Sequence, residues 1–157
     1  MRRFAPELAI GAALGGFEAV AEEETTRCVL RRLGLQPSGD TDPALMAAVY
    51  AFLGESGVGY DRFFFDLHGG LVREARALSG PAKEHYAGPH WQSLRSILEL
   101  YPPARRVPPA YFEGEGPCTL LIDEIESIWS AIAERDDWAP FEDKVRRIRE
   151  MGAAYRD

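Results

Sequence analysis

The sequence lacks the features that mark membrane and secreted proteins. No run approaches the ~18 consecutive apolar residues that a membrane-spanning helix needs. The first residues carry positive charge at Arg2 and Arg3, but Glu7 interrupts the apolar stretch that a secretory signal requires. The two cysteines, Cys28 and Cys118, form no CxxC pair, so we expect reduced, buried thiols, with a disulfide between them as the alternative. These absences predict a cytoplasmic protein without a membrane segment.

An excess of basic charge is missing as well. The 157 residues carry 18 Lys and Arg against 25 Asp and Glu, which gives a formal net charge of -7. Nucleic-acid-binding domains usually show a basic patch or stripe, whereas acidic residues surround most of the short basic clusters in this chain. We therefore expect neither a nucleic-acid partner nor a membrane partner.

No segment alternates apolar and polar residues convincingly over five residues, so we expect few strands. Hydrophobic residues nevertheless make up 46% of the sequence, enough to build a core in one compact domain. Helical periodicity, with glycines and prolines as stops, predicts an all-α fold: a single-domain irregular bundle of about six to seven helices with a proline-rich strap. The expected helices cover about 17–33, the segment after Asp42-Pro43, 60–67, 71–78, about 90–100, and a C-terminal pair within 118–151.

Two helix boundaries are predicted from particular residues. Gly34 is expected to end the first helix in a left-handed conformation, with Leu35 folding back on the last turn. Asp42 is an N-cap candidate for the next helix, because Pro43 suits the first helical position. Residues 1–16 are expected to be flexible, since the glycines among them oppose a helix at about 1 kcal/mol each.

A proline-rich segment, residues 102–117, separates the last two helices from the rest. Its prolines remove backbone donors and favour an extended chain, so we expect a strap that Tyr111 and Phe112 pin to the surface. The last two helices should pack through an apolar stripe, with acidic residues facing outward, and all three tryptophans should lie in the core or at helix contacts. The stripe comprises Leu121, Ile125, Ile128, Trp129 and Ile132 and continues with Phe141, Val145 and Ile148, and the acidic residues are Asp123, Glu124 and Glu126.

The segment Tyr60–Gly70 is the one around which we expect the domain to be organised. It places Phe63, Phe64 and Phe65 in a row, and burying three such rings is worth roughly 5–9 kcal/mol, comparable to the net stability of a small domain. A short helix there should end at the glycine pair. Polar residues follow the rings at once, so the richest polar cluster lies at the edge of the densest apolar one.

Asp66 and His68 admit two interpretations. Residues two apart on a continuous helix point in different directions, but at a helix end they converge, and the acid then orients the imidazole. In the alternative, which we favour, His68 bonds terminal helix carbonyls and the glycines form the turn. If this segment lines a pocket, Arg62, Asp66 and His68 are the predicted ligand-binding residues. No catalytic residue is assigned.

Other polar patterns are weaker indications of a site. His85 and His90 flank a short loop, but a metal needs three or four ligands, and a third would have to come from His68 through a tertiary contact. The glycine-rich run 11–16 lacks the Gly-Lys-Ser/Thr ending and the preceding strand of a phosphate-binding loop. We therefore predict no metal and no cofactor.

Two stretches near the C-terminus resemble a known family. The sequences LIDEIE at 121–126 and DDWAPFEDK at 136–144, with Ala131 between them, are similar to the helical C-terminal end of SelO-type protein adenylyltransferases. The sequence RVPPAY at 106–111 occupies the position of that family's proline-containing strap. RLGL at 32–35, the helix after Asp42-Pro43 and the segment Tyr60–Gly70 occur in a similar order. The resemblance covers most of this chain but only the last part of a much longer enzyme.

The resemblance implies a kinase-like fold that uses ATP and a divalent metal to transfer AMP onto protein hydroxyls. The residues that hold the nucleotide and the metal in that family belong upstream of this segment, and we find no counterpart of them in the 157 residues. The prediction is therefore a non-catalytic, cytoplasmic helical interaction domain that binds a catalytic protein partner or forms a homo-oligomer. The alternatives are a small-molecule-binding or enzymatic domain with a pocket around Asp66 and His68, and a structural remnant of a larger ancestor.

Overall fold

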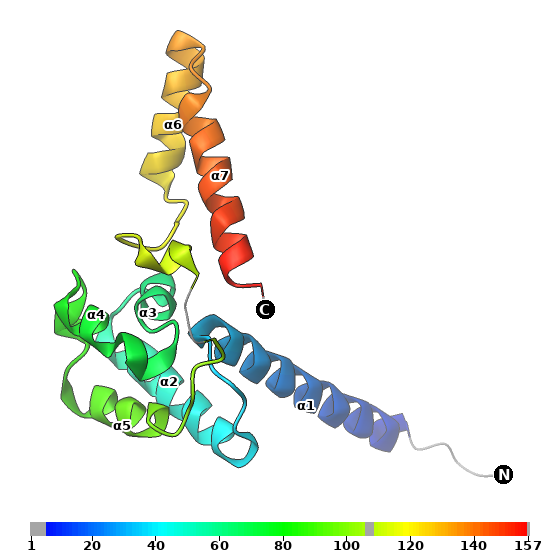
Figure 1. The fold of residues 1–157 in the computed structure, drawn as a ribbon. Coiled ribbons are helices and arrows are strands. Elements are labelled where there is room, and N and C mark those ends of the chain that lie inside the picture. Colours follow the sequence, from blue (N-terminus) through cyan, green and yellow to red (C-terminus); the bar gives the residue numbers. More distant parts are fainter. Residues whose placement is uncertain (1–5, 106–108, 157) are drawn as a thin grey trace.

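The computed structural model describes residues 6–105 and 109–156, with side chains from residue 16 onward. Within these residues the chain forms seven α-helices and four short 3-10 turns, and its only extended pairing is an isolated bridge between Leu35 and Pro103. The predicted all-α fold is therefore confirmed (Figure 1). The helices are α1 (Pro6–Leu33), α2 (Asp42–Ser56), α3 (Tyr60–Asp66), α4 (Glu74–Ser79), α5 (Gly88–Leu98), α6 (Ile122–Arg135) and α7 (Ala139–Ala154), and the 3-10 turns are η1 (Gly39–Thr41), η2 (Gly70–Arg73), η3 (Lys83–His85) and η4 (Ala110–Glu113).

The first helix is longer than the sequence predicts. It begins at Pro6 and runs through three glycines, whereas we expected a helix from Phe17. Each glycine costs about 1 kcal/mol, but every residue added to an existing helix gains a backbone hydrogen bond, and the alanines between the glycines favour continuation. Figure 1 shows α1 projecting away from the rest of the molecule. Neither α1 nor any other helix within the described residues is long and apolar enough to cross a membrane. Residues 1–5, which were also expected to be flexible, lie outside the described part of the chain.

The end of α1 has the predicted glycine cap. Gly34 is left-handed with a φ of 62°, its N–H donates to the Arg31 carbonyl (3.1 Å), and the N–H of Leu35 donates to the Leu30 carbonyl (3.0 Å). These two bonds close the last turn in the Schellman arrangement. A Cβ atom at Gly34 would lie 2.8 Å from the His68 ring, so packing requires the glycine as well. The cap thus fixes α1 against the segment that carries His68.

The start of α2 differs from the prediction. Asp42 is the first residue of the helix rather than its N-cap, and Thr41 precedes it without a side-chain capping bond. The Asp42 carboxylate instead accepts from the N–H groups of Ser38 (3.1 Å) and Gly39 (3.2 Å) and from the Tyr101 hydroxyl (2.8 Å). Because these donors belong to the preceding turn and to the residues after α5, Asp42 ties the two together instead of capping its own helix.

The main core lies where α2, α3 and α5 meet the end of α1. Phe52 is fully buried, and its ring centroid lies 5.6 Å from that of Phe63 and 5.7 Å from those of Tyr86 and Trp91. The predicted apolar faces of α2 and α5 both contribute to this cluster. The aromatic segment in mid-chain is therefore part of the core, as its composition predicts.

A second apolar cluster forms where the strap crosses α3. Phe65 and Phe112 are both fully buried with ring centroids 5.8 Å apart, and Tyr111 and Tyr155 pack against them. The other two phenylalanines of α3 belong to the main core. Tyr111 and Phe112 thus anchor the strap as expected, and strap residues 106–108 lie outside the described part of the chain. This cluster joins the middle of the sequence to its C-terminal end.

The last two helices form a hairpin that rises from the body (Figure 1). Among their described residues only Ala131, Lys144 and Ala154 are buried. Glu124 was expected to face outward, but it forms an ion pair with Lys144 at 2.5 Å. Two helices bury only one strip between them, so much of the predicted apolar stripe stays exposed. The predicted core position is therefore wrong for Trp129 (66% exposed), whereas Trp138 (50% exposed) contacts the Phe141 ring of α7.

Candidate functional site

The three predicted ligand-binding residues divide into two groups. Arg62 and Asp66 lie one turn apart in α3, and Arg62 Nε donates to Asp66 Oδ2 at 2.9 Å. His68 lies beyond the end of the helix and bonds the Arg32 carbonyl. Asp66 and His68 therefore do not form the hydrogen-bonded pair that one interpretation predicts. The assignment of these three residues to ligand binding remains a prediction.

Asp66 is a fully buried carboxylate that accepts hydrogen bonds through one of its two oxygens. Its Oδ2 also accepts from the Tyr86 hydroxyl at 3.1 Å, and its Oδ1 lies 3.9 Å from Arg76 Nε. Burial, reinforced by the neighbouring carboxylate, raises the pKa of Tyr86, so the phenol stays protonated and donates. A buried ionised carboxylate needs such partners because its desolvation is costly.

Three arginines, two of them paired with this carboxylate, reach the backbone of the strap. Arg73 Nη2 donates to the Phe112 carbonyl at 2.6 Å, and Arg76 Nη1 donates to the same oxygen at 2.5 Å. Arg62 Nη1 donates to the Glu115 carbonyl at 3.1 Å. We call Arg62, Arg73 and Arg76 the arginine latch. Carbonyls in an irregular segment need hydrogen-bond partners, and the latch supplies them.

His68 lies between the end of α1 and the strap. Its Nδ1 is 3.0 Å from the Arg32 carbonyl, and its ring stacks on Phe112 with centroids 3.7 Å apart and planes 7° apart. Because a carbonyl only accepts, Nδ1 carries the proton of the neutral ring. Burial lowers the pKa of His68, the bond to Arg32 partly offsets this, and the charges of Arg105 and Arg73 lower the pKa further. His68 does bond a carbonyl at the end of a helix, as the favoured interpretation expects, but the helix is α1.

The buried imidazole predicts a pH dependence of stability. The unfolded chain holds His68 at its ordinary pKa of 6.5, and folding lowers that pKa, so the unfolded state binds the proton more readily. The stability contributed by His68 is therefore complete above pH 6.5 and is lost as the pH falls toward the folded pKa, by at most about 1.4 kcal/mol per pH unit. Urea unfolding across this range should give a shallower pH slope for His68→Gln than for the parent. The exposed His90→Gln control should keep the parent slope, and equal slopes for all three proteins would contradict the prediction.

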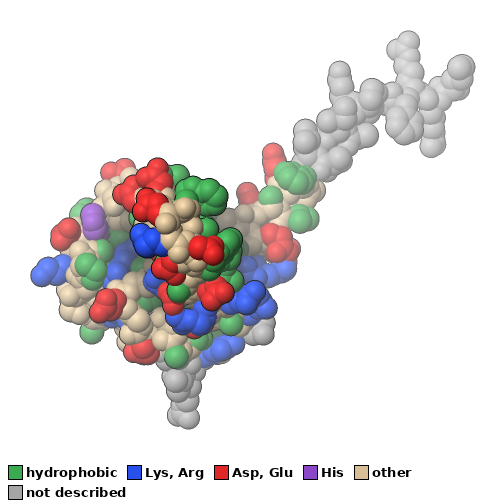
Figure 2. Space-filling view, turned by 90° about the horizontal axis from the view of Figure 1, so that it is seen from above, with side chains coloured by type: hydrophobic (Ala, Val, Ile, Leu, Met, Phe, Trp, Pro, Cys, Tyr) green, Lys and Arg blue, Asp and Glu red, His purple; other side chains and the backbone are tan. Residues whose placement is uncertain are grey.

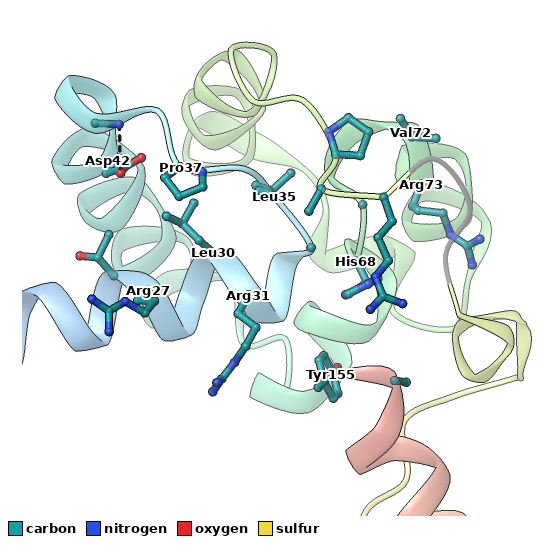
Figure 3. Close-up of a pocket in the computed structure, with 18 of the residues that line it drawn as sticks. Arg27, Leu30, Arg31, Leu35, Pro37, Asp42, His68, Val72, Arg73 and Tyr155 are labelled. Carbon is teal, nitrogen blue, oxygen red and sulfur yellow. Dashed lines mark hydrogen bonds between the residues drawn. The ribbon is translucent and has the colours of Figure 1, made fainter. Parts of the chain in front are cut away.

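A groove of about 860 Å³ runs between α1 and the segment after α3 (Figure 3). Leu30 and Leu35 contribute apolar surface, and His68 lines the groove beside them. In Figure 3, Arg31 extends from α1 on one side, and His68 and Arg73 lie on the other side. The other two predicted ligand-binding residues do not line it. Its volume falls within the ~300–1,000 Å³ that small-molecule sites usually have.

The weaker sequence patterns do not converge on a site. His85 Nδ1 lies 2.6 Å from the Ser56 carbonyl, and His90 is exposed on α5. In the part of the chain that the structure describes, no three His, Cys, Asp or Glu side chains are grouped so that they could hold a metal. The glycine run 11–16 is part of α1 rather than a loop. Both cysteines are free, one half-buried and one buried.

Sequence reasoning found Arg62 but missed Arg73 and Arg76. Their spacing of three residues in predicted helical turns indicates a shared face, which was a usable signal. Nothing local indicates that this face meets a carbonyl 36–39 residues later. The groove was missed for the same reason, since its lining comes from segments that are far apart in the sequence.

Comparison with known proteins assigns this chain to a family. The sequence matches the profile of the family described as protein adenylyltransferase SelO over residues 3–149, which is nearly the whole chain. The chain belongs to the SelO family. The resemblance noted in the C-terminal helices and in the strap is thereby confirmed.

The curated relatives that the chain matches are much longer than the matched region. The protein nucleotidyltransferase YdiU of Synechocystis sp. is 30% identical over 158 residues, which cover 92% of this chain and 33% of the relative. The protein of the same name from Gloeobacter violaceus is 28% identical over 152 residues, covering 88% of this chain and 30% of the relative. The chain thus spans about a third of the length of the curated relatives that it matches. No solved structure matches the chain.

Proposed function

We propose that this chain is a non-catalytic, cytoplasmic interaction domain that packs against the nucleotide-transferring portion of a SelO-type protein. The observation that carries the proposal is the exposed apolar face of the α6–α7 hairpin. The curated relatives are named nucleotidyltransferases, and about two thirds of their length lies outside the match. The partner that we propose is the portion that corresponds to those two thirds.

Large apolar side chains are concentrated on α6 and at the tip of the hairpin. Ile122, Ile125 and Trp129 recur at three- and four-residue steps, which places them on one face of α6, and all three are exposed. Near the start of α7, Trp138 and Phe141 form a ring contact with centroids 5.9 Å apart and are also largely exposed. Figure 2, which looks down onto the hairpin, shows hydrophobic side chains next to acidic ones. A large exposed apolar patch with a polar rim is typical of a protein–protein interface.

The groups best suited to acid–base chemistry support the fold instead. The carboxylate of Asp66 is bound by Arg62 and Tyr86, and the ring of His68 bonds a carbonyl of α1. Asp66 is fully buried and His68 nearly so, which supports a non-catalytic role for this portion of the protein, because a general base must reach its substrate.

The test is a chimera in which this chain replaces the matching third of the Synechocystis relative. Protein nucleotidyl transfer by the chimera is then measured. Covalent linkage raises the effective concentration of the two portions, so even a weak interface should form. We expect the chimera to be more active than the relative without that third. The double substitution Ile125→Asp with Trp129→Asp should reduce the activity by about tenfold or more, because docking would bury unpaired carboxylates.

The matched control is Leu78→Asp with Leu100→Asp. Both residues are exposed and apolar, and neither lies on the hairpin. This control adds the same charge and should leave the activity of the chimera within about twofold. Equal losses in the two double variants would contradict docking through the hairpin face. If sizing instead shows that the isolated chain self-associates through Ile125 and Trp129, a second copy is the partner.

A further inference from the structure

The end of α7 is where the hairpin packs against the rest of the molecule (Figure 1). The Tyr155 ring has edge contacts with Phe112, at 5.1 Å between centroids, and with His68, at 5.8 Å. The Arg32 guanidinium lies 5.0 Å from the centroid of the same ring. Tyr155 therefore meets side chains from α1, from the segment after α3 and from the strap. We call Arg32, His68, Phe112 and Tyr155 the joint.

Little else in the hairpin is buried. Among the hairpin residues that the structure describes, only Ala131, Lys144 and Ala154 are buried, and Lys144 pairs with Glu124 across the hairpin itself. The residues of the main core come from other parts of the chain. Contacts at the joint can therefore break while the main core stays intact, which is the condition for a local opening.

His68 is the group of the joint that can change its charge near neutral pH. In the neutral ring Nδ1 donates to the Arg32 carbonyl at 3.0 Å, and one face stacks on Phe112. Nε2 forms no hydrogen bond with any residue that the structure describes, and the side chain is only 6% exposed. A second proton would add a charge that gains no acceptor from these residues and little solvation from water.

The charged and titratable groups around His68 do not compensate such a charge. One arginine comes from each of α1, η2 and the strap, and α7 contributes a tyrosine: these are Arg32, Arg73, Arg105 and Tyr155. Asp61 and Glu113 already pair with two of the arginines, at 2.9 and 2.6 Å. Burial raises the pKa of Tyr155, so its phenol stays neutral. Protonation of His68 in the closed joint is therefore unfavourable.

We propose that the joint is an acid-sensitive hinge: protonation of His68 opens it, and the hairpin then detaches from the body while the main core stays folded. In the open joint water reaches the imidazole, which takes up a proton at its ordinary pKa of 6.5, whereas burial lowers that pKa in the closed joint. Below pH 6.5 the ratio of open to closed joints therefore rises by at most about tenfold per pH unit, until the closed form also binds the proton. The hinge belongs to this chain alone, so the inference does not depend on the proposed docking partner.

Native-state hydrogen exchange of the full chain, at low urea concentrations and between about pH 6.5 and 5.5, tests the proposal. The amides of Phe112, Cys118 and Tyr155 should exchange through a common opening that is insensitive to urea and becomes at most about tenfold more frequent over this range. The core amides of Phe52 and Leu94 should exchange only through global unfolding, with a steep urea dependence. If both sets show the same protection and the same urea dependence, the joint does not open separately, which overturns the proposal.

Two variants of His68 identify the titrating group. His68→Phe keeps an aromatic ring against Phe112, and His68→Gln keeps a donor for the Arg32 carbonyl. Neither side chain titrates in this pH range, so the opening should lose its pH dependence in whichever of them folds. His90→Gln, at an exposed position, should keep the response of the parent. A parent-like pH response in a His68 variant would assign the effect to another group and overturn the proposal.

Discussion

Replacing Asp66 with alanine is expected to lower the free energy of unfolding by about 3–5 kcal/mol, a large share of the stability of a small domain. The carboxylate is fully buried and is the shared counter-charge for Arg62 and Arg76, which also bind the strap. Its removal leaves two guanidinium groups close together without compensation, and it leaves the Tyr86 hydroxyl without its acceptor. Urea unfolding followed by circular dichroism measures the loss.

Asp61→Ala is the control for this prediction. Asp61 lies in the same helix and is ion-paired with Arg32 at 2.9 Å, but it is exposed, so its loss should cost less than about 1 kcal/mol. Limited proteolysis gives a second readout, because Asp66→Ala should expose the strap near Gly114 to cleavage while Asp61→Ala should not. If the two variants unfold alike, the buried carboxylate does not organise the latch.

The elements that sequence reasoning predicted well are those fixed by neighbouring residues. The glycine cap at Gly34 and the apolar face of α2 depend on contacts within a few residues, and the structure has both. The start of α1 was misplaced because individual glycine propensities were weighed without the gain from extending an existing helix. Asp42 was mispredicted as an N-cap because one of its actual donors, Tyr101, lies 59 residues away in the sequence.

The candidate site was only partly predictable for a related reason. Periodicity shows that Ile125 and Trp129 share a face of α6, but it does not show what covers that face. The position of His68 at a helix-terminal carbonyl could be expected from its neighbouring glycines, yet the identity of that helix depends on tertiary packing. Sequence reasoning therefore identified Arg62, Asp66 and His68 but not their partners.

Replacing Phe112 with alanine is expected to cost about 3–5 kcal/mol, although this residue lies in a segment with little regular structure. Its ring is fully buried, stacks on His68 at 3.7 Å, and has edge contacts with Tyr111 at 5.0 Å and Tyr155 at 5.1 Å between centroids. The cavity would lie where the strap meets the C-terminal end of the chain, so both segments should loosen. Phe141→Ala removes an equal ring from an exposed position and should cost less than about 1 kcal/mol.

The pKa of His68 distinguishes loss of this cluster from a general loss of stability. Burial is the main cause of its lowered pKa, so removing the stacked ring should admit water and raise the pKa toward 6.5, as measured by NMR titration of the imidazole. Phe112→Ala and Asp66→Ala should also be less than additive, because the latch holds the backbone carbonyl of Phe112 while the cluster holds its ring. Strict additivity with an unchanged His68 pKa would mean that the strap is held at two independent points rather than as one unit.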